Sequence, residues 1–564
     1  MKDYDGNRLV RLFDKRWAFL GDWRNRWEEF SQYIMPQQRT FTSHVNAGNE
    51  RQSRIIFDST ALEANERLAT RLHEALTSPS SPWFSLGFKD EDLNKIDAAK
   101  EWLEECEVRI RRALRESNFD IAMGQFNLDL GCLGSAVLTA DEKESKYTQE
   151  DVFNGLNFTN IHLEGIGVGQ NSEREIDQVF WRFEYTADQC VQRWGDKAPK
   201  QAIDLVNEHN PDTILKMMVC MFPRHLEQKP TKTTLLPKER PWARVYVNHS
   251  TKEMVEDGGT YEKAVFVGRW RLKSEDPMGY GPGERALPTI RTVNEAERLE
   301  LAAWAKVIDP PILSESNNVV GDVNIRSAGI TNVRDITKIR TWDIRPDINH
   351  HLIQLEDKRF QIRDIFKYHQ LELPPREQVG AMTAYEVARR SEQIYRALGP
   401  TMTQLQSDVL NPLLQRVFGI MLRKNALPEI PEVLIQAGAS LEINYIGPMA
   451  LAQRATEVEA MDRFLLDSIN LAEMFPKALD VIDIDGMQRH KAELLGVPAV
   501  ALRGQDDVDA IREERVALAE EQRDLDTAVQ ESQVASNLGQ GLGPERAAEI
   551  MEHAGGNVEP IRGG

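Results

Sequence analysis

The stretch GYGPGERALPTI (residues 279–290) opens the part of the chain that decides the fold. Its glycines and proline indicate a turn, after which a helix is expected over 287–308 with Pro288 in its first turn. This helix ends before Pro310 and Pro311, because proline lacks the N–H that a helix interior needs. The stretch therefore predicts a turn that leads into one long helix.

A second helix is expected over 350–371, where apolar residues recur on one stripe and the helix stops before Pro374. Each helix has about 22 residues and is expected to be about 33 Å long. The residues between them, which include VVGDVNIRSAGITNVRDITKIRTWDI, hold glycines and short β-like runs. Two matched helices with an insert predict an arm with a small domain at its tip. An insert this small has little core of its own, so we expect it to pack against neighbouring copies.

Downstream of the arm, the sequence predicts a very long helix over 383–425. Apolar residues keep three- and four-residue steps, and Thr383 with Glu386 forms a capping box at the start. About 43 residues span about 65 Å if straight, with kinks expected at Gly399-Pro400 and at Pro412. A helix of this length exceeds the core of one ordinary domain, so it spans an assembly or joins two domains.

The residues before the arm divide into helices and then short strands. A stripe from Phe13 to Ile34 predicts a single long helix ended by Pro36, and Thr60 with Glu63 predicts a capping box. Further helices are expected over 60–76, 97–116 and 119–130. Half-buried strands are expected over 136–139, 158–163, 179–185, 214–222, 244–248 and 265–272. This region is therefore predicted to be a mostly antiparallel α+β body.

The C-terminal part returns to helices after one strand, SLEINYIG (440–447). Helices are expected over 450–469 and in a shorter unit that ends at LLGVP (494–498). Residues 504–533 hold three basic and ten acidic residues, a balance of −7. The last residues are rich in glycine and are expected to form a flexible tail.

Composition excludes several classes of protein. The 564 residues are 41% hydrophobic and 28% charged, which is typical of a folded protein of several domains. No stretch is long and apolar enough for a membrane helix, and the N-terminus has no apolar region of the signal-peptide type. The 69 basic and 89 acidic residues give a net charge of −20. A free-standing DNA-coating protein is excluded, because neutralising phosphates requires a basic surface.

Motifs for catalysis or cofactor binding are missing from the sequence. It contains no ATP phosphate loop, no H-E-x-x-H and no C-x-x-C. The glycine clusters GIGVG (165–169) and GYGPG (279–283) are interpreted as turns, and Ser135 lacks the frame of a nucleophile elbow. His350 and His351 are interpreted as polar helix surface, and four scattered cysteines indicate a reducing compartment. We expect no enzyme, no cofactor and no metal site, but a structural or binding role.

Seven fragments in order resemble the head-to-tail connecting, or portal, proteins of short-tailed, podovirus-type bacteriophages. The fragments are LHEALTSPSSPWFSL (72–86), FNLDLGCLGSAVL (126–138), GYGPGERALPTI (279–290), DPPIL (309–313), AMTAYEVARR (381–390), LGPTMTQLQSDVLNPLLQRVF (398–418) and GVPAVALRGQDDVDAIREER (496–515). The resemblance covers the chain from Leu9 to about Glu521.

The resemblance implies a helix-rich α+β subunit that assembles as a ring, usually of twelve copies, around a DNA channel. It divides the chain into named parts. These are the wing (1–286), the first stem helix (287–308), the clip (309–349), the second stem helix (350–372), the tunnel loop (373–382), the long helix with a return strand of the wing (383–448), the crown (449–503), an acidic C-terminal helix (504–535) and the flexible tail (536–564).

The resemblance also implies where DNA and partners would be contacted. The tunnel loop, LPPREQVGAM, is expected to place Arg376, Glu377 and Gln378 at the narrowest part of the channel, although by sequence alone it is equally a surface loop. In the clip, the candidate contacts to DNA or to the motor are Arg326, Arg334, Lys338, Arg340 and Arg345. Salt bridges between subunits are an alternative role for these basic residues.

The partners implied are further copies of the chain, double-stranded DNA, the terminase motor, a tail adaptor, and the major capsid and scaffolding proteins. The implied location is the capsid portal vertex of the virion after assembly in the host cytoplasm, with no membrane involved. Two alternatives are a tail adaptor, which is usually much shorter, and a packaging enzyme, which requires the missing phosphate loop.

Overall fold

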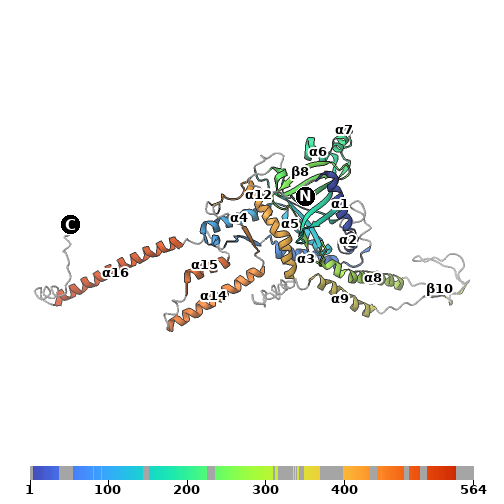
Figure 1. Cartoon of the computed structure of the whole chain (residues 1–564). Helices are drawn as coiled ribbons and strands as arrows, with labels where there is room; N and C mark the ends of the chain where they lie inside the picture. The colour runs from blue at the N-terminus through green and yellow to red at the C-terminus, as the bar shows by residue number, and fades with distance from the viewer. Residues whose placement is uncertain are drawn as a thin grey trace.

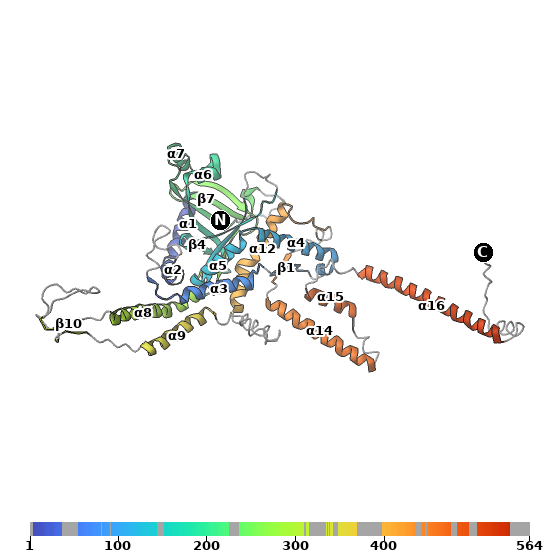
Figure 2. The same ribbon diagram turned by 180° about the vertical axis from the view of Figure 1, so that it is seen from behind.

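The computed structural model describes residues 4–36, 55–79, 82–90, 92–143, 152–224, 236–308, 312–314, 334–335, 337, 339–341, 348–368, 398–431, 434, 441–445, 448–474, 482–495 and 505–541. They form a helix-rich α+β fold with antiparallel sheets, which confirms the predicted class. Two parts project from the body on different sides (Figures 1 and 2). One is the arm of α8 (Pro282–Ile308) and α9 (Ile348–Ile365); the other comprises α14 (Pro448–Met474), α15 (Ile484–Leu495) and α16 (Gln505–Gly541).

The body contains two antiparallel sheets. Both contribute to the larger hydrophobic core, and other residues of the five-stranded sheet lie in two smaller cores. The five-stranded sheet runs in the order β4 (Ile166–Gln170), β5 (Ile176–Thr186), β6 (Ile214–Pro223), β7 (Trp242–Asn248), β8 (Met254–Thr260). The three-stranded sheet runs β3 (Leu156–Asn160), β2 (Ser135–Glu142), β9 (Val265–Arg269). Two short helices, α6 (Ala187–Trp194) and α7 (Lys200–Asn207), pack at one end of the larger sheet (Figure 1). The six predicted strands are confirmed in place, but β3 and β9 each end three residues before the predicted ends at 163 and 272.

The single N-terminal helix predicted from the stripe of Phe13 to Ile34 is wrong, because the structure has two helices. They are α1 (Gly6–Phe19) and α2 (Gly21–Ile34), and the chain leaves helical geometry at Leu20. Phe13 is buried against the five-stranded sheet, whereas Trp27 is buried in the other core. The apolar stripe continues across the break because the apolar residues of α1 are buried in one core and those of α2 in another.

The GIGVG cluster is strand β4 and not the turn that its glycines suggested. The glycines allow close packing of α1 on this strand. A Cβ atom at Gly167 would lie 3.1 Å from the Cβ of Arg16, and one at Gly169 would lie 2.7 Å from its guanidinium carbon. The lack of a side chain at these positions therefore serves helix–sheet contact rather than a reversal of the chain.

Three further helices build the larger core. They are α3 (Thr60–Leu76), α4 (Asp97–Glu116) and α5 (Phe119–Leu133), close to the predicted bounds. The predicted capping box at Thr60 is not formed, because Ser59 is the N-cap residue. The hydroxyl of Ser59 donates to Glu63 at 3.2 Å, while Asp58 accepts from the N–H of Thr60 at 3.0 Å.

The arm begins earlier than predicted, because Pro282 rather than a residue near Pro288 occupies the start of α8. Its second helix, α9, begins at Ile348 and ends at Ile365, six residues before the predicted end. The strands β10 (Ile312–Ser314) and β11 (Ile339–Thr341) pair antiparallel at the outer end of the arm, which Figure 1 shows far from the body.

The long helix is described from Leu398 onward, and the predicted residues 383–397 lie outside the described residues. Helical residues 398–405 lead into a π-helical turn at Gln406–Leu410 and then into α12 (Asn411–Arg423). The π-helical turn lies just before Pro412, where a kink was predicted. Because Pro412 has no N–H, the carbonyl of Asp408 cannot form its usual helical hydrogen bond, and the regular α-helix is interrupted here.

The C-terminal segments follow the predicted order. Strand β12 (Leu441–Tyr445) pairs antiparallel with β1 (Phe84–Phe88), which connects this part to the body. Helices α14 and α15 pack together, and Lys491 forms an ion pair with Asp462 between them. Helix α16 continues to Gly541, so its last six residues lie within the predicted tail. Residues 542–564 lie outside the described residues.

Candidate functional site: the arm and its attachment to the body

Close backbone contacts between glycines attach the start of the arm to the body. Gly134 ends α5 with a φ of 76°, a left-handed conformation that favours glycine. Side chains at Gly134, Gly279 or Gly281 would overlap the backbone of one another. The hydroxyl of buried Ser135 accepts from the N–H of Gly279 at 2.8 Å, so this serine has a structural contact. Two of the fragments that carry the resemblance, GCLGSAV and GYGPG, therefore meet at the root of the arm.

A polar latch connects both arm helices to the residues before α3. On α8, the amide of Asn294 donates to the carbonyl of Ile55 at 2.9 Å and accepts from the N–H of Phe57 at 2.7 Å. On α9, Arg359 donates to Asp58 at 2.8 Å and forms an ion pair with Glu297 of α8. Burial works to lower the pKa of Arg359, but its hydrogen bonds to carboxylates raise it, so the guanidinium stays charged.

The arm also exposes large apolar side chains. On α8 the exposed fractions are 54% for Leu299, 55% for Leu301, 42% for Trp304 and 80% for Ile308, and on α9 they are 64% for Ile353 and 56% for Phe360. The spacing of Leu301, Trp304 and Ile308 places them on one face of α8. Apolar patches of this kind mark surfaces that contact other protein.

The tip of the arm holds few described residues. Among the predicted clip contacts, Arg334 is exposed, and Arg340 lies in β11 opposite Leu313 of β10. Arg326, Lys338 and Arg345 lie outside the described residues, as do Arg376, Glu377 and Gln378 of the predicted tunnel loop. The described residues therefore do not test the predicted site, and the roles of its residues stay predictions.

The inner end of α9 borders a recess of about 470 Å³. Tyr368 lines it together with residues of α3, and the guanidinium of Arg67 lies over the Tyr368 ring at 4.5 Å. Three glutamates and two arginines of α3 surround the recess: Glu63, Glu66, Glu74, Arg67 and Arg71. Tyr368 is followed directly by the segment that leads to the predicted tunnel loop.

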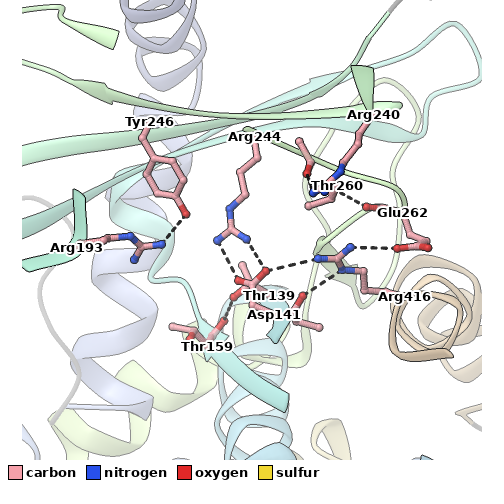
Figure 3. Close-up of polar contacts among 12 residues, drawn as sticks. Thr139, Asp141, Thr159, Arg193, Arg240, Arg244, Tyr246, Thr260, Glu262 and Arg416 are labelled. Carbon is pink, nitrogen blue, oxygen red and sulfur yellow. Dashed lines mark hydrogen bonds and ion pairs between the residues drawn. The ribbon is translucent and has the colours of Figure 1, made fainter. Parts of the chain in front are cut away.

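A network of arginines and carboxylates joins the two sheets of the body to the long helix (Figure 3). Arg244 of β7 forms a bidentate ion pair with Asp141 of β2, which also lies 3.9 Å from Arg416 of α12. Arg416 donates to Glu262 at 3.0 Å, and Glu262 in turn accepts from Arg423.

Gly419 of α12 is the position that leaves room for the Glu262 carboxylate. Burial lowers the pKa of Arg416, an effect that Asp141 and Glu262 oppose. A charge this deeply buried is stable only with partners, so the network fixes α12 against both sheets.

A second buried pair holds the π-helical turn. Arg269 of β9 donates to both carboxylate oxygens of Asp408, at 2.9 and 2.8 Å. The side chains are only 6% and 12% exposed, so this pair is nearly shielded from solvent. Together with the network around Arg416, it ties the described part of the long helix to the body at two places.

The described residues include possible metal ligands, four cysteines and several long helices. Among them, no group of three or more His, Cys, Asp or Glu side chains is placed to hold a metal ion. All four cysteines are buried and unpaired. No helix in the described ranges is both long and apolar enough to cross a membrane.

Sequence analysis missed the latch and both buried ion-pair systems. Their partners are far apart in sequence, for example Asp141 and Arg244, so local periodicity cannot pair them. A usable signal was present for the two ion-pair systems, since Arg269 and Arg416 interrupt the apolar runs VFVGRW and LLQRVF. A charge inside a buried run requires a partner, although the run does not identify it.

Comparison with known proteins is consistent with this architecture. A family model described as bacteriophage head to tail connecting protein matches residues 7–502. The chain is 25% identical over 522 residues to the portal protein of Salmonella phage epsilon15, with 91% of each chain covered. It is 25% identical over 517 residues to a probable portal protein of Bordetella phage BPP-1, with 90% of this chain and 91% of that protein covered. These matches confirm the resemblance that the seven fragments indicated.

Proposed function

The chain belongs to the bacteriophage head to tail connecting protein family, and we propose that this structural portal protein works as a ring of twelve copies at one capsid vertex. The ring encloses a channel through which double-stranded DNA enters during packaging and leaves during ejection. One side docks the terminase motor and then the tail adaptor, and the wing contacts capsid and scaffolding proteins. The family is structural rather than enzymatic.

The observation that carries this proposal is the apolar surface of the arm. One chain leaves Leu301, Trp304 and Ile308 of α8 in water, together with Ile353 and Phe360 of α9. A cyclic ring gives every arm two neighbours, so an apolar face of one copy is covered by a different face of the next. In this arrangement α8 and α9 are the stem helices, and the tip with β10 and β11 is the clip.

The test is Leu301→Asp in the full chain, with Ile121→Asp as a matched control. Both positions are exposed apolar residues on helices, but Ile121 is on α5 in the body and is 80% exposed. We expect Leu301→Asp to give folded subunits without rings in electron micrographs, whereas Ile121→Asp keeps the rings. Normal rings from Leu301→Asp would count against the arm as the subunit interface.

The acidic balance fits a channel in which DNA slides without sticking. Twelve copies at −20 give roughly −240 charges, and like charge prevents tight binding of phosphate. The clip is less acidic. Within residues 317–347, Arg326, Arg334, Lys338, Arg340 and Arg345 stand against Asp322, Asp335, Asp343 and Asp347, a balance of +1. These bases face the motor, the DNA or the next subunit. Tight, salt-sensitive binding of linear DNA by purified rings would contradict the sliding channel.

The segment 373–382 serves as the tunnel loop in this proposal, with Arg376, Glu377 and Gln378 facing the DNA. Arg376→Glu is expected to leave ring assembly intact but to reduce the packaging or retention of DNA. The assay compares the DNA content of mutant and wild-type particles. Normal genome filling and retention would refute the role, while loss of rings would assign the segment to the subunit interface instead.

A further inference from the structure

Helix α9 presents one row of exposed residues to solvent, which we call the α9 row. It consists of Ile353, Asp357, Phe360 and Asp364, whose steps of four, three and four residues place them along one face of the helix. Arg359, which contacts α8, lies about 160° around the helix axis from Asp357. The α9 row therefore faces away from α8 of its own chain, with two carboxylates and two apolar side chains.

Helix α8 has an exposed row with the same steps, which we call the α8 row. It consists of Arg291, Glu295, Arg298 and Ala302. Arg291 forms an ion pair with Glu29 of α2, and Arg298 forms one with Glu295, but the two arginine side chains remain 49% and 48% exposed. A guanidinium has five N–H donors, so each arginine can bind a second carboxylate.

The ion pair between Glu297 and Arg359 aligns the two helices along the arm. Helix α8 runs outward from the body and α9 runs back toward it (Figures 1 and 2). Arg298 is one residue outward of Glu297, and Asp357 is two residues outward of Arg359. Because a helix rises 1.5 Å per residue, Arg298 and Asp357 lie at the same height along the arm to within about 1.5 Å.

The match repeats nearer the body. Arg291 and Asp364 are each seven residues inward of Arg298 and Asp357, so they also share a height. Between the two levels, Glu295 of the α8 row is at the height of uncharged Phe360. The arginines of the α8 row are therefore level with the acids of the α9 row, and Glu295 is not level with either acid.

We infer that the α9 row of each copy packs against the α8 row of the next copy in the ring, pairing Asp357 with Arg298 and Asp364 with Arg291. Rotation about the ring axis keeps equivalent residues at equal height, so neighbouring arms that lie along the axis meet with these pairs aligned. The inference rests on the proposed function and deepens it, because it names the two faces and the ion pairs that join neighbouring copies.

The charged side chains beside the α9 row interact within their own chain. Glu356 forms an ion pair of 2.8 Å with Arg359. The guanidinium carbon of Arg363 lies 6.0 Å from the centre of the Tyr368 ring, which directs this charge toward the body. The first turn of α8 lies inward of the last residue of α9, so its charges are not level with the α9 row. These groups therefore leave the two proposed pairs without competing like charges.

Other occupants fit the two rows less well. Two α9 rows placed face to face bring carboxylates against carboxylates, which is unfavourable for like charges. DNA is repelled by the acids of the α9 row. A foreign basic helix can pair with the α9 row but leaves the arginines of the α8 row without acids. The next copy supplies both charges at the required heights.

The first test is the double variant Glu295→Cys with Phe360→Cys in the full chain, treated with a short bis-maleimide crosslinker. Both residues are exposed, and their replacement leaves the two proposed ion pairs in place. The four native cysteines are buried, and burial raises the pKa of their thiols, so they stay unreactive in the folded protein. We expect a ladder of covalent dimers, trimers and larger species on a denaturing gel, because each copy is joined to one neighbour through α8 and to the other through α9.

Three controls define the geometry of this contact. Phe360→Cys with Glu300→Cys moves one thiol to another side of α8, about 140° around the helix axis. Phe360→Cys with Arg285→Cys moves it ten residues, or about 15 Å, toward the body. Both control pairs and the two single variants are expected to stay monomeric on the gel. An equal ladder from either control pair, or dimers from Phe360→Cys alone, would overturn the inference.

A charge exchange tests the pairing itself. Asp357→Arg places two arginines against each other at every contact and is expected to raise the subunit concentration needed for half assembly about tenfold or more. Adding Arg298→Asp restores opposite charges at every contact and is expected to return this concentration to within about threefold of wild type. Lys358→Glu changes a charge on a different side of α9 and is expected to have no effect. Failure of the exchange to restore assembly would overturn the pairing.

Light scattering of the crosslinking samples before treatment separates this inference from the proposed function. Rings of normal mass that give no ladder would overturn the inference and leave the ring standing. A ladder from a chain that forms no closed rings would support the inference and contradict the ring. Monomers without crosslinks would contradict both.

Discussion

Trp27 in the body and Trp304 on the arm are residues of the same type in very different surroundings. Trp27 is 0% exposed in the larger core, whereas Trp304 is 42% exposed and donates a hydrogen bond of 3.3 Å to Glu300. Trp27 therefore stabilises the fold of a single chain. In the proposed ring, Trp304 would instead contact a neighbouring copy and stabilise the assembly.

Ion pairs repeat this contrast. Arg269 and Asp408 in the body have side chains only 6% and 12% exposed, while Arg298 and Glu295 on the arm are 48% and 55% exposed. A buried pair is strongly destabilising when one partner is removed, whereas an exposed pair contributes little. The pair in the body is therefore expected to contribute much more to the stability of one chain than the exposed pair on the arm.

The largest expected effect comes from exchanging the two tryptophans for alanine. Trp27→Ala leaves a cavity in the core and is expected to lower the free energy of unfolding by about 3–5 kcal/mol. Trp304→Ala is expected to leave the unfolding of a dissociated subunit unchanged but to weaken ring assembly. Urea unfolding followed by circular dichroism measures the first effect, and light scattering measures the second. Equal destabilisation by both variants would remove the contrast between body and arm.

Arg269→Ala is the next largest change, with an expected loss of about 3 kcal/mol because Asp408 is left buried without its main partner. Lys263 interacts electrostatically with Asp408, which keeps the loss near the lower end of the range. Arg298→Ala on the arm is the matched control, with an expected change below about 1 kcal/mol. The measurement is the urea midpoint of both variants. A larger effect from Arg298→Ala would contradict the comparison.

Gly134→Ala tests the attachment between body and arm. We expect a loss of about 2 kcal/mol or more, because alanine is strained at a φ of 76° and its Cβ would overlap Gly279 and Gly281. Gly124→Ala lies in the same helix, α5, where an added Cβ meets nothing within 4 Å, and it is expected to be neutral or stabilising. Thermal unfolding of both variants provides the comparison. Tolerance of Gly134→Ala would refute the role of this close packing.

The smallest expected effect is a pH dependence in the body. Burial lowers the pKa of His73, against the opposing influence of Asp120 and Glu74, so the folded protein binds fewer protons than the unfolded chain. Stability from this group is therefore present above the ordinary histidine pKa of about 6.5 and is lost as the pH falls through that value toward the folded pKa. Between pH 8 and pH 5.5, the free energy of unfolding is therefore expected to fall less for His73→Gln than for the wild type. The difference between the two is expected to develop over about one pH unit. An identical pH profile for both proteins would contradict it.

Much of the body could be predicted from sequence because its signals are local. Three- and four-residue steps predicted α3, α4 and α5 nearly to the residue, and valine-rich runs predicted the central strands. The break at Leu20 could not be predicted, because it depends on two cores that only the tertiary structure separates. Strand β4 was missed because its glycines are selected by the contact with α1 and not by a turn.

The functional site was less predictable than the fold. The arm was predicted from its two matched helices, and the family from seven fragments, and the comparisons confirm the family. The latch of Asn294 and Arg359 was not predicted, because its partners at Ile55, Phe57 and Asp58 are more than two hundred residues away. The predicted channel contacts in the tunnel loop and most of those in the clip lie outside the described residues and stay predictions.

The most direct test of the central claim is the mass of the purified full chain in solution. The claim is that the body is complete in one copy whereas the arm is complete only among neighbours. Twelve copies of a 64.3 kDa chain predict a particle of roughly 770 kDa, with ring-shaped averages by electron microscopy. A folded, stable particle of 64.3 kDa at micromolar concentration would contradict the account.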